Sequence, residues 1–183
     1  VEDEVRLITN NPCDVLKEKK VDRTITPRTR FLDKPELRLV VEELSHVQHP
    51  DYPKQSVRIT SVTVADFLTL LLFTGLRRAE ASSLKWEDVN LDDRYFIIHD
   101  TKNGTDHTVP MSAQVEVMLQ RRHDDRDKGA IWVFPNKRKT GPLQEPRKQI
   151  ERLEQITGVK FSCHDLRRTF ATLAEAHGID HHS

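Results

Sequence analysis

The chain has 183 residues and carries 29 basic and 29 acidic side chains, with 36% hydrophobic and 32% charged residues. This length suits one domain with a buried core, and the composition excludes a disordered or fibrous chain. No apolar run approaches the roughly 20 residues of a membrane span, and the N-terminus shows no signal-peptide pattern, so membrane and secreted proteins are not expected.

The first thirty residues lack the pattern of a compact domain. Asn11–Pro12 ends a short apolar stretch, and the polar segments Lys17–Lys20 and Thr24–Arg30 show no periodicity. This composition is typical of a linker. We therefore expect a compact domain to begin near Phe31.

Three helices are predicted next. Asp33 is a predicted N-cap, and apolar residues within Leu37–Val47 recur at helical spacing. A second helix is predicted from about Val57 to Phe73, and its almost wholly apolar last turns indicate burial on several sides. Gly75 ends this helix, and a short helix from about Arg77 to Leu84 follows.

The second half of the chain combines strands with helices. Tyr95–His99 and His107–Met111 are β-prone and flank Asn103–Gly104, which is a strong hairpin signal. A third strand is predicted at Ile131–Phe134. The pattern predicts an α+β domain, predominantly helical, with a small antiparallel three-stranded sheet. Further helices are predicted near Ser112–Arg122, Pro146–Thr157 and Cys163–His177.

The segment Ser162–Arg168 is the richest in chemical groups. Ser162 and Asp165 fit a capping box, which predicts a helix start. His164 then lies in the first turn, where backbone N–H groups and the helix dipole favour an anion, and Arg167 shares its face. A phosphate site and a capped surface helix with incidental charges are equally compatible with these residues.

Two other segments carry candidate cations. Arg77 follows the apolar helix through the Gly75 turn, so packing should hold it in place, and Glu80 can orient its guanidinium. Such a pair is usually a surface salt bridge, but its place after an apolar helix favours burial. Lys102 lies at the predicted hairpin tip, where a lysine is normally exposed. In a cleft, a desolvated lysine can donate a proton.

Together these segments resemble the catalytic domain of tyrosine recombinases, the phage integrase family. The motifs of that family are T-G-x-R-x-x-E, a lysine on a β-hairpin and H-x-L-R. This sequence has Thr74–Glu80, Lys102 and His164–Arg167 in the same order. Leu84–Val89 and Val109–Pro110 are further matches, and the ordered combination is highly specific.

The resemblance covers about residues 31–183 and implies a domain organisation. Residues 1–30 are similar to the end of a core-binding domain and the interdomain linker, and residues 31–183 to a C-terminally truncated catalytic domain. In the family, a second His or Trp and then the tyrosine nucleophile follow the H-x-L-R box. None of the sixteen residues after Arg167 is Tyr or Trp, and Tyr52 and Tyr95 precede the box. We therefore expect no nucleophile in this chain.

The resemblance implies site-specific DNA recombination by strand cleavage and rejoining through a 3′-phosphotyrosine intermediate. Arg77 and Arg167 would neutralise charge on the phosphoryl oxygens. Lys102 would protonate the leaving oxygen, and His164 would assist proton transfer. Glu80 would orient Arg77. No metal and no cofactor is implied, because arginines supply the positive charge.

Double-stranded DNA is the expected partner. Residues 1–120 carry a net charge of −4, whereas residues 121–168, which include Arg121–Arg122, carry +6. A basic segment is compatible with a polyanion, although an unevenly charged solvated surface explains it at least as well. The resemblance further implies a tetramer on paired recombination sites and a cytoplasmic, nucleoid-associated protein from a bacterium or phage. The predicted DNA-binding residues are Arg78, Lys137, Arg138, Lys139, Arg147, Lys148 and Arg168.

Two other interpretations stay open. A non-catalytic DNA-binding fragment or module is favoured by the missing tyrosine and disfavoured by the intact set of cations. A type I topoisomerase of the same chemistry would need partner segments that are not evident. His177, His181 and His182 are attributed to a helix end rather than to a metal site, and Cys163 to a buried thiol without a catalytic role.

Overall fold

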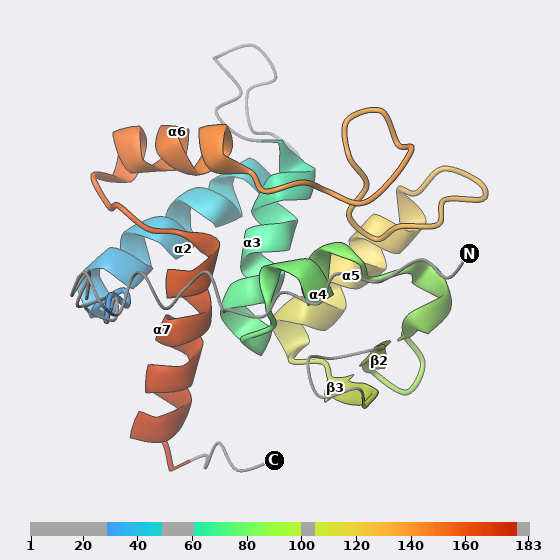
Figure 1. Cartoon of the computed structure of the whole chain (residues 1–183), viewed down its shortest axis with the longest axis horizontal. Coiled ribbons are helices and arrows are strands. Elements are labelled where there is room, and N and C mark those ends of the chain that lie inside the picture. Colours follow the sequence, from blue (N-terminus) through green and yellow to red (C-terminus); the bar gives the residue numbers. More distant parts are fainter. Residues whose placement is uncertain (1–28, 49–60, 100–104, 179–183) are drawn as a thin grey trace, which may run out of the picture.

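The computed structural model describes residues 29–48, 61–99 and 105–178, which fold into helices and a small sheet (Figure 1). The α+β class predicted from the sequence is confirmed. Within these ranges no helix is both long and apolar enough to cross a membrane. The elements are α2 (Lys34–Gln48), α3 (Val62–Thr74), α4 (Arg78–Ser82), the 3₁₀ helix η1 (Trp86–Asp88), β1 (Val89–Asn90), β2 (Tyr95–Ile98), β3 (His107–Pro110), α5 (Ala113–Asp124), α6 (Arg147–Thr157) and α7 (Cys163–Ala176).

Helix α3 lies at the centre of the domain. Figure 1 shows it between α2 and α7 on one side and α5 on the other, and it packs against all three. Its residues from Val64 to Leu72 are buried with one exception, as the apolar sequence predicts. The helix begins at Val62 rather than near Val57, because Ser61 is its N-cap and accepts a hydrogen bond from the Val64 N–H at 3.3 Å. Residues 57–60 lie outside the described residues.

The antiparallel sheet has the strand order β1–β2–β3. Phe96 of the central strand pairs with Val89 of β1 and Val109 of β3, and its side chain is fully buried. Strands β2 and β3 are the two predicted hairpin strands. They flank residues 100–104, which contain the Asn103–Gly104 signal and lie outside the described residues.

The prediction of a strand at Ile131–Phe134 is wrong, because β1 is the third strand of the sheet. The segment instead meets residues 84–86 through one isolated bridge and two backbone hydrogen bonds of 3.0 Å. Pro135 follows directly and has no backbone N–H with which to extend that pairing. These four β-prone residues therefore contribute one isolated bridge and no strand.

A buried carboxylate joins α3 to α5. Asp66 is fully buried and accepts hydrogen bonds from the guanidinium groups of Arg121 and Arg122, the latter at 2.8 Å. Arg122 also donates to the Val133 carbonyl at 2.7 Å and lies over the Phe134 ring. These two arginines of the basic segment therefore contribute to the interior network rather than to an open cationic surface.

The segment before α2 is fastened to α7. The buried Leu32 donates its backbone N–H to the Thr169 hydroxyl at 2.9 Å. Arg30 donates to the Lys160 carbonyl at 3.1 Å and to Glu36 at 2.8 Å. Residues 1–28 lie outside the described residues, so the domain boundary at residue 30 stays a prediction.

Candidate functional site

The turn that ends α3 requires a glycine. Gly75 has a φ of 65°, which lies in the left-handed region, and its N–H donates to the Leu71 carbonyl at 3.0 Å. A Cβ at this position would lie 2.3 Å from Cδ1 of Phe170 in α7. Both the backbone conformation and the approach of α7 therefore depend on the missing side chain.

Arg77 leaves this turn toward solvent and is held by Glu80. Leu76 takes the buried position after the turn, and Arg77 is the N-cap of α4. The Glu80 carboxylate accepts from the Arg77 backbone N–H at 2.8 Å and from its Nη1 at 2.7 Å. The side chain of Arg77 is 47% exposed and that of Glu80 is 12% exposed. The expectation that Arg77 is buried is therefore wrong, although its partner is largely enclosed.

Helix α7 brings its arginine to the same turn. Ser162 and Asp165 form the predicted capping box, with hydrogen bonds of 3.3 Å and 2.9 Å between backbone N–H groups and side-chain oxygens. His164 is exposed in the first turn of the helix. Arg167, half-buried one turn further on, donates through Nη1 to the carbonyl of Gly75. The two arginine-bearing motifs, far apart in sequence, thus meet at the end of α3.

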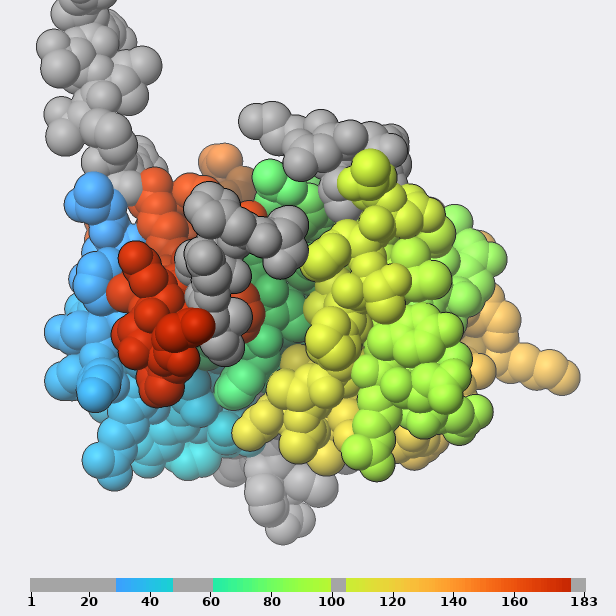
Figure 2. Space-filling view, turned by 90° about the horizontal axis from the view of Figure 1, so that it is seen from below, coloured from blue at the N-terminus to red at the C-terminus, as the bar shows by residue number. Residues whose placement is uncertain are grey.

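Figure 2 looks onto the side of the molecule where α7 meets the end of α3. Helix α7 lies on one side and the strands of the sheet on the other, and the α3–α4 region is visible between them. Lys102, the remaining predicted catalytic residue, lies outside the described residues. Strands β2 and β3 precede and follow the segment that carries Lys102. In Figure 2 they lie across this face from α7.

The predicted DNA-binding residues differ in how far they are exposed. Arg168 turns inward, because its Nη1 atom is buried and lies 3.5 Å from the Asp165 carboxylate. Arg78 in α4 is partly exposed. The other five are exposed and belong to the loop after the 131–134 segment and to the first turn of α6: Lys137, Arg138, Lys139, Arg147 and Lys148.

The loop that carries three of these cations is held by its own hydrogen bonds. The Asn136 side-chain oxygen accepts from the backbone N–H groups of Arg138 at 3.0 Å and Thr140 at 3.2 Å. Lys139 has a φ of 57°, and its ammonium pairs with Asp127. The loop therefore presents Arg138 from an ordered turn.

The exposed cations also differ in whether a carboxylate pairs with them. Lys139 pairs with Asp127, and Arg147 pairs with Glu145 at 3.1 Å. Lys137, Arg138 and Lys148 pair with no carboxylate of the described residues. Sequence alone gave these cations equal weight, because ion pairing depends on which side chains the fold brings together.

Cys163 is the first residue of α7, beside His164, and its thiol is not activated. Its side chain is buried, and burial, with the nearby Glu145 charge adding to it, raises the pKa of the thiol to about 11. The group is therefore a neutral thiol at physiological pH. This environment agrees with the prediction of a non-catalytic thiol.

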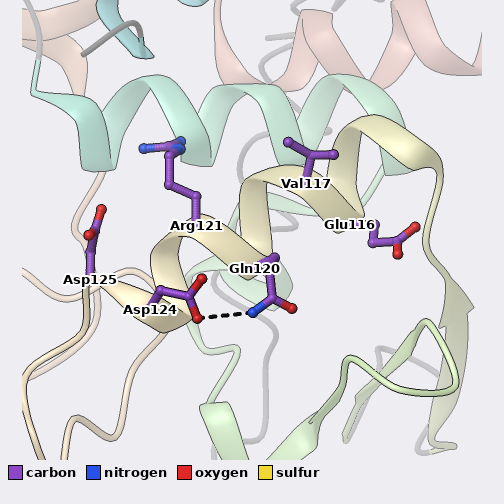
Figure 3. Close-up of a pocket in the computed structure, with 6 residues that line it drawn as sticks. All are labelled: Glu116, Val117, Gln120, Arg121, Asp124 and Asp125. Atoms are coloured by element: carbon purple, nitrogen blue, oxygen red, sulfur yellow. Dashed lines mark hydrogen bonds between the residues drawn. The ribbon is translucent and has the colours of Figure 1, made fainter.

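Two hollows on the surface of α5 are separate from the predicted catalytic residues. One, drawn in Figure 3, is shallow and rich in carboxylates, with Gln120 donating to Asp124 at 3.0 Å. The other is an apolar groove of about 410 Å³ between α2, α3 and α5, bordered by Val41, Phe73 and Val117. Neither contains a predicted catalytic residue, and the carboxylates of the first would repel phosphate.

Comparison with known proteins agrees with the motifs. A putative integrase/recombinase of Haemophilus influenzae is 29% identical over 162 residues, which are 88% of this chain and 42% of that protein. Tyrosine recombinase XerA of Pyrococcus furiosus is 27% identical over 179 residues, which are 93% of this chain and 56% of that protein. The chain thus spans about half the length of these relatives.

Solved structures share the fold. The XerH site-specific recombinase, in a post-cleavage complex with a palindromic difH substrate, is 26% identical with a TM-score of 0.62, and the match covers 84% of this chain and 43% of that one. The Tn1549 transposon integrase, in complex with circular intermediate DNA, is 20% identical with a TM-score of 0.65, covering 94% and 60%. The phage integrase family matches residues 37–183, which are most of the chain, and the chain therefore belongs to this family.

Proposed function

We propose that this chain provides the phosphate-binding part of a site-specific recombinase that cleaves and rejoins double-stranded DNA. One observation carries the proposal: Arg167 of the H-x-L-R helix contacts the carbonyl of Gly75 in the T-G-x-R turn. Relatives with this fold have been solved with DNA, and one of those complexes is described as post-cleavage. The family match supports the same chemistry.

Arg77 and Arg167 are the proposed phosphate ligands. Glu80 engages Nη1 of Arg77, which leaves Nε and Nη2 for a phosphoryl oxygen, and the Gly75 carbonyl orients Arg167. Two guanidinium groups fixed before the substrate arrives stabilise the charge that develops in the transition state without reorganisation. Glu80 acts by orienting Arg77.

The proposed step is an exchange of one phosphoester for another. A tyrosine hydroxyl attacks the scissile phosphorus, its proton passes to His164, and the bond from phosphorus to the 5′ oxygen breaks. Lys102 gives that oxygen a proton, so the products are a 3′-phosphotyrosine and a free 5′-hydroxyl. Reversal on another strand rejoins the DNA without ATP.

Neither tyrosine of these 183 residues is the proposed nucleophile. Tyr95 belongs to strand β2, and its hydroxyl accepts a hydrogen bond from the Asn90 side chain at 3.3 Å. Tyr52 lies outside the described residues and, like Tyr95, precedes the H-x-L-R box. We assign the nucleophile to a tyrosine of a longer protein, because this chain spans only about half the length of its relatives.

The proposed DNA contacts combine the exposed loop with the start of α6. Lys137, Arg138 and Lys148 are the strongest candidates, because the described residues offer them no carboxylate. Lys139, Arg147, Arg78 and Arg168 would contribute less, since three of these have partners within the chain and Arg78 is only partly exposed. In the complete protein we propose a tetramer on paired sites, bound to the nucleoid in the cytoplasm.

The covalent intermediate tests the function. Duplexes tiled from the DNA around the gene, each with a nick that lets the short cleaved strand diffuse away, trap a protein–DNA adduct. We expect an adduct from the longer protein and none from the 183-residue chain. In the longer protein Arg167→Ala should reduce the cleavage rate by about a hundred- to a thousandfold, as for other lost transition-state donors. An adduct formed by the 183-residue chain would contradict the assignment of the nucleophile.

A non-catalytic DNA-binding module is the second candidate. The exposed Lys137, Arg138 and Lys148 support it, because phosphate contacts bind DNA whether or not a strand is cleaved. It predicts DNA binding by the longer protein with no adduct on any duplex, including a duplex that the longer protein binds tightly.

A further inference from the structure

His99 lies where strand β2 ends, and both of its ring nitrogens contact carboxylates. Nδ1 lies 2.9 Å from Oδ2 of Asp106, and Nε2 lies 2.9 Å from Oδ1 of Asp88. An ionised carboxylate only accepts hydrogen bonds, so both nitrogens must donate. Only the doubly protonated imidazolium has two N–H groups. The geometry therefore requires the charged form of this histidine.

The contact joins three parts of the chain. The ladder between β2 and β3 ends with the pair Ile98–His107, so His99 and Asp106 face each other on the next rung. Asp88 ends η1 and stands directly before β1. The imidazolium thus ties the end of β2 to the start of β3, and ties both to η1. We call this arrangement the His99 clasp.

The clasp is adjacent to two motifs of the proposed active site. Residues 100–105, which include Lys102, connect the two ends that it holds. Helix η1, its third attachment, follows α4 after a short connection, and α4 begins after Arg77. The clasp therefore ties the ends of the lysine segment to η1, which follows in the chain the helix that Arg77 caps.

We propose that His99 is a positioning residue for Lys102: as an imidazolium it holds both ends of the segment that carries the lysine and anchors them to η1. The inference rests on the proposed function, because Lys102 has this role only in a strand-cleaving enzyme. A neutral imidazole has one N–H and would leave one carboxylate facing a ring nitrogen that cannot donate. The clasp opens when His99 loses its proton.

The charges around His99 favour its protonated form. The hydrogen bonds to Asp106 and then to Asp88 raise the pKa of His99 above its usual value. Glu87, beside Asp88, is paired with Lys85 at 2.8 Å, and that lysine first and the charge of His99 last lower the pKa of Glu87. A raised pKa means that the clasp is complete at low pH and is lost as the pH rises through that pKa.

The first test measures the protonation of His99 in the 183-residue chain. In ¹⁵N-edited NMR spectra of the imidazole rings we expect both nitrogens of His99 to be protonated at pH 7. Its titration midpoint should lie above the value of about 6.5 that is usual for a histidine. Asp106→Asn and Asp88→Asn should each lower the midpoint. A neutral His99 at pH 7, or a midpoint at or below that usual value, would overturn the proposal.

The second test distinguishes a role of His99 in positioning Lys102 as a general acid from a role in stabilising the fold. It uses the longer protein and two duplexes, one with the natural 5′ oxygen at the scissile phosphate and one with sulfur in its place. A thiolate leaves without a proton, so cleavage of the sulfur duplex needs no general acid. We expect His99→Gln to slow cleavage of the oxygen duplex at least tenfold and to leave the sulfur duplex unaffected.

Controls assign each outcome. His107→Gln should cleave both duplexes at the wild-type rate, and Lys102→Ala should show the same oxygen-specific defect as His99→Gln. If Lys102→Ala has no such defect, the proposed role of Lys102 fails. If Lys102→Ala has it and His99→Gln slows both duplexes equally or neither, the present inference fails. The ratio of wild-type to His99→Gln rates should fall toward one as the pH rises through the His99 midpoint.

Discussion

Gly75 shows how a single residue decides the geometry of the candidate site. Its φ of 65° costs any other residue about 1 kcal/mol, and a Cβ would press on the Phe170 ring at 2.3 Å. We expect Gly75→Ala to lower the free energy of unfolding by about 2 kcal/mol or more, measured by urea denaturation. Gly158→Ala is the matched control, because Gly158 has a φ of 70° but no atom within 4 Å of the added Cβ. Equal losses in both variants would contradict the role of the Phe170 contact.

Cys163 makes a second prediction at the residue scale. With a pKa of about 11, its thiolate fraction near pH 8 is about a hundredfold below that of an ordinary cysteine, and burial hinders access as well. In a Cys13→Ser background we expect iodoacetamide to label the native chain at least a hundredfold more slowly than the urea-unfolded chain. The native rate should rise as the pH approaches the pKa. Complete labelling within minutes at pH 7.5 would show that the thiol is accessible and ionised.

At the scale of elements, the contact between α3 and α5 depends on one carboxylate. Removing Asp66 leaves the guanidinium groups of Arg121 and Arg122 against the interior without their acceptor. Because an unpaired charge is costly there, we expect Asp66→Ala to lower the free energy of unfolding by about 3 kcal/mol. Asp124→Ala, at an exposed position of α5, should change it by less than about 0.5 kcal/mol. A loss below about 1 kcal/mol for Asp66→Ala would mean that water replaces the carboxylate.

At the scale of the whole molecule, the neutral net charge conceals an uneven surface. The 183-residue chain should bind duplex DNA weakly, with an affinity that falls steeply as salt rises, because each phosphate contact releases counterions. We expect Lys137→Ala and Arg138→Ala each to reduce the slope of log K against log salt by about 0.9, measured by fluorescence anisotropy. Lys139→Ala is the control, since Asp127 already pairs with that ammonium. An affinity that does not depend on salt would exclude this mode of binding.

Local signals in the sequence were sufficient for most of the elements. The Ser162–Asp165 capping box, the glycine that ends α3 and the alternation of the hairpin strands each depend on residues within a few positions of one another. The start of α3 was predicted too early from the apolar run alone, because Ser61, an N-cap within that run, is where the helix begins. The strand expected at Ile131–Phe134 failed because β propensity does not specify a partner, and the partner was a short bridge to residues 84–86.

The sequence by itself determined the membership of the family, since three motifs in a fixed order identify it, and also the α+β class. It determined which cations are candidates for binding DNA, but not which of them pair with carboxylates in the folded chain. Only the tertiary structure decided that Arg167 meets the Gly75 turn, that Arg121 and Arg122 serve Asp66, and that Arg77 is exposed. The physical reason is distance along the chain: caps and turns form between near neighbours, whereas these pairings arise only when packing of α3 against α5 and α7 brings remote side chains together.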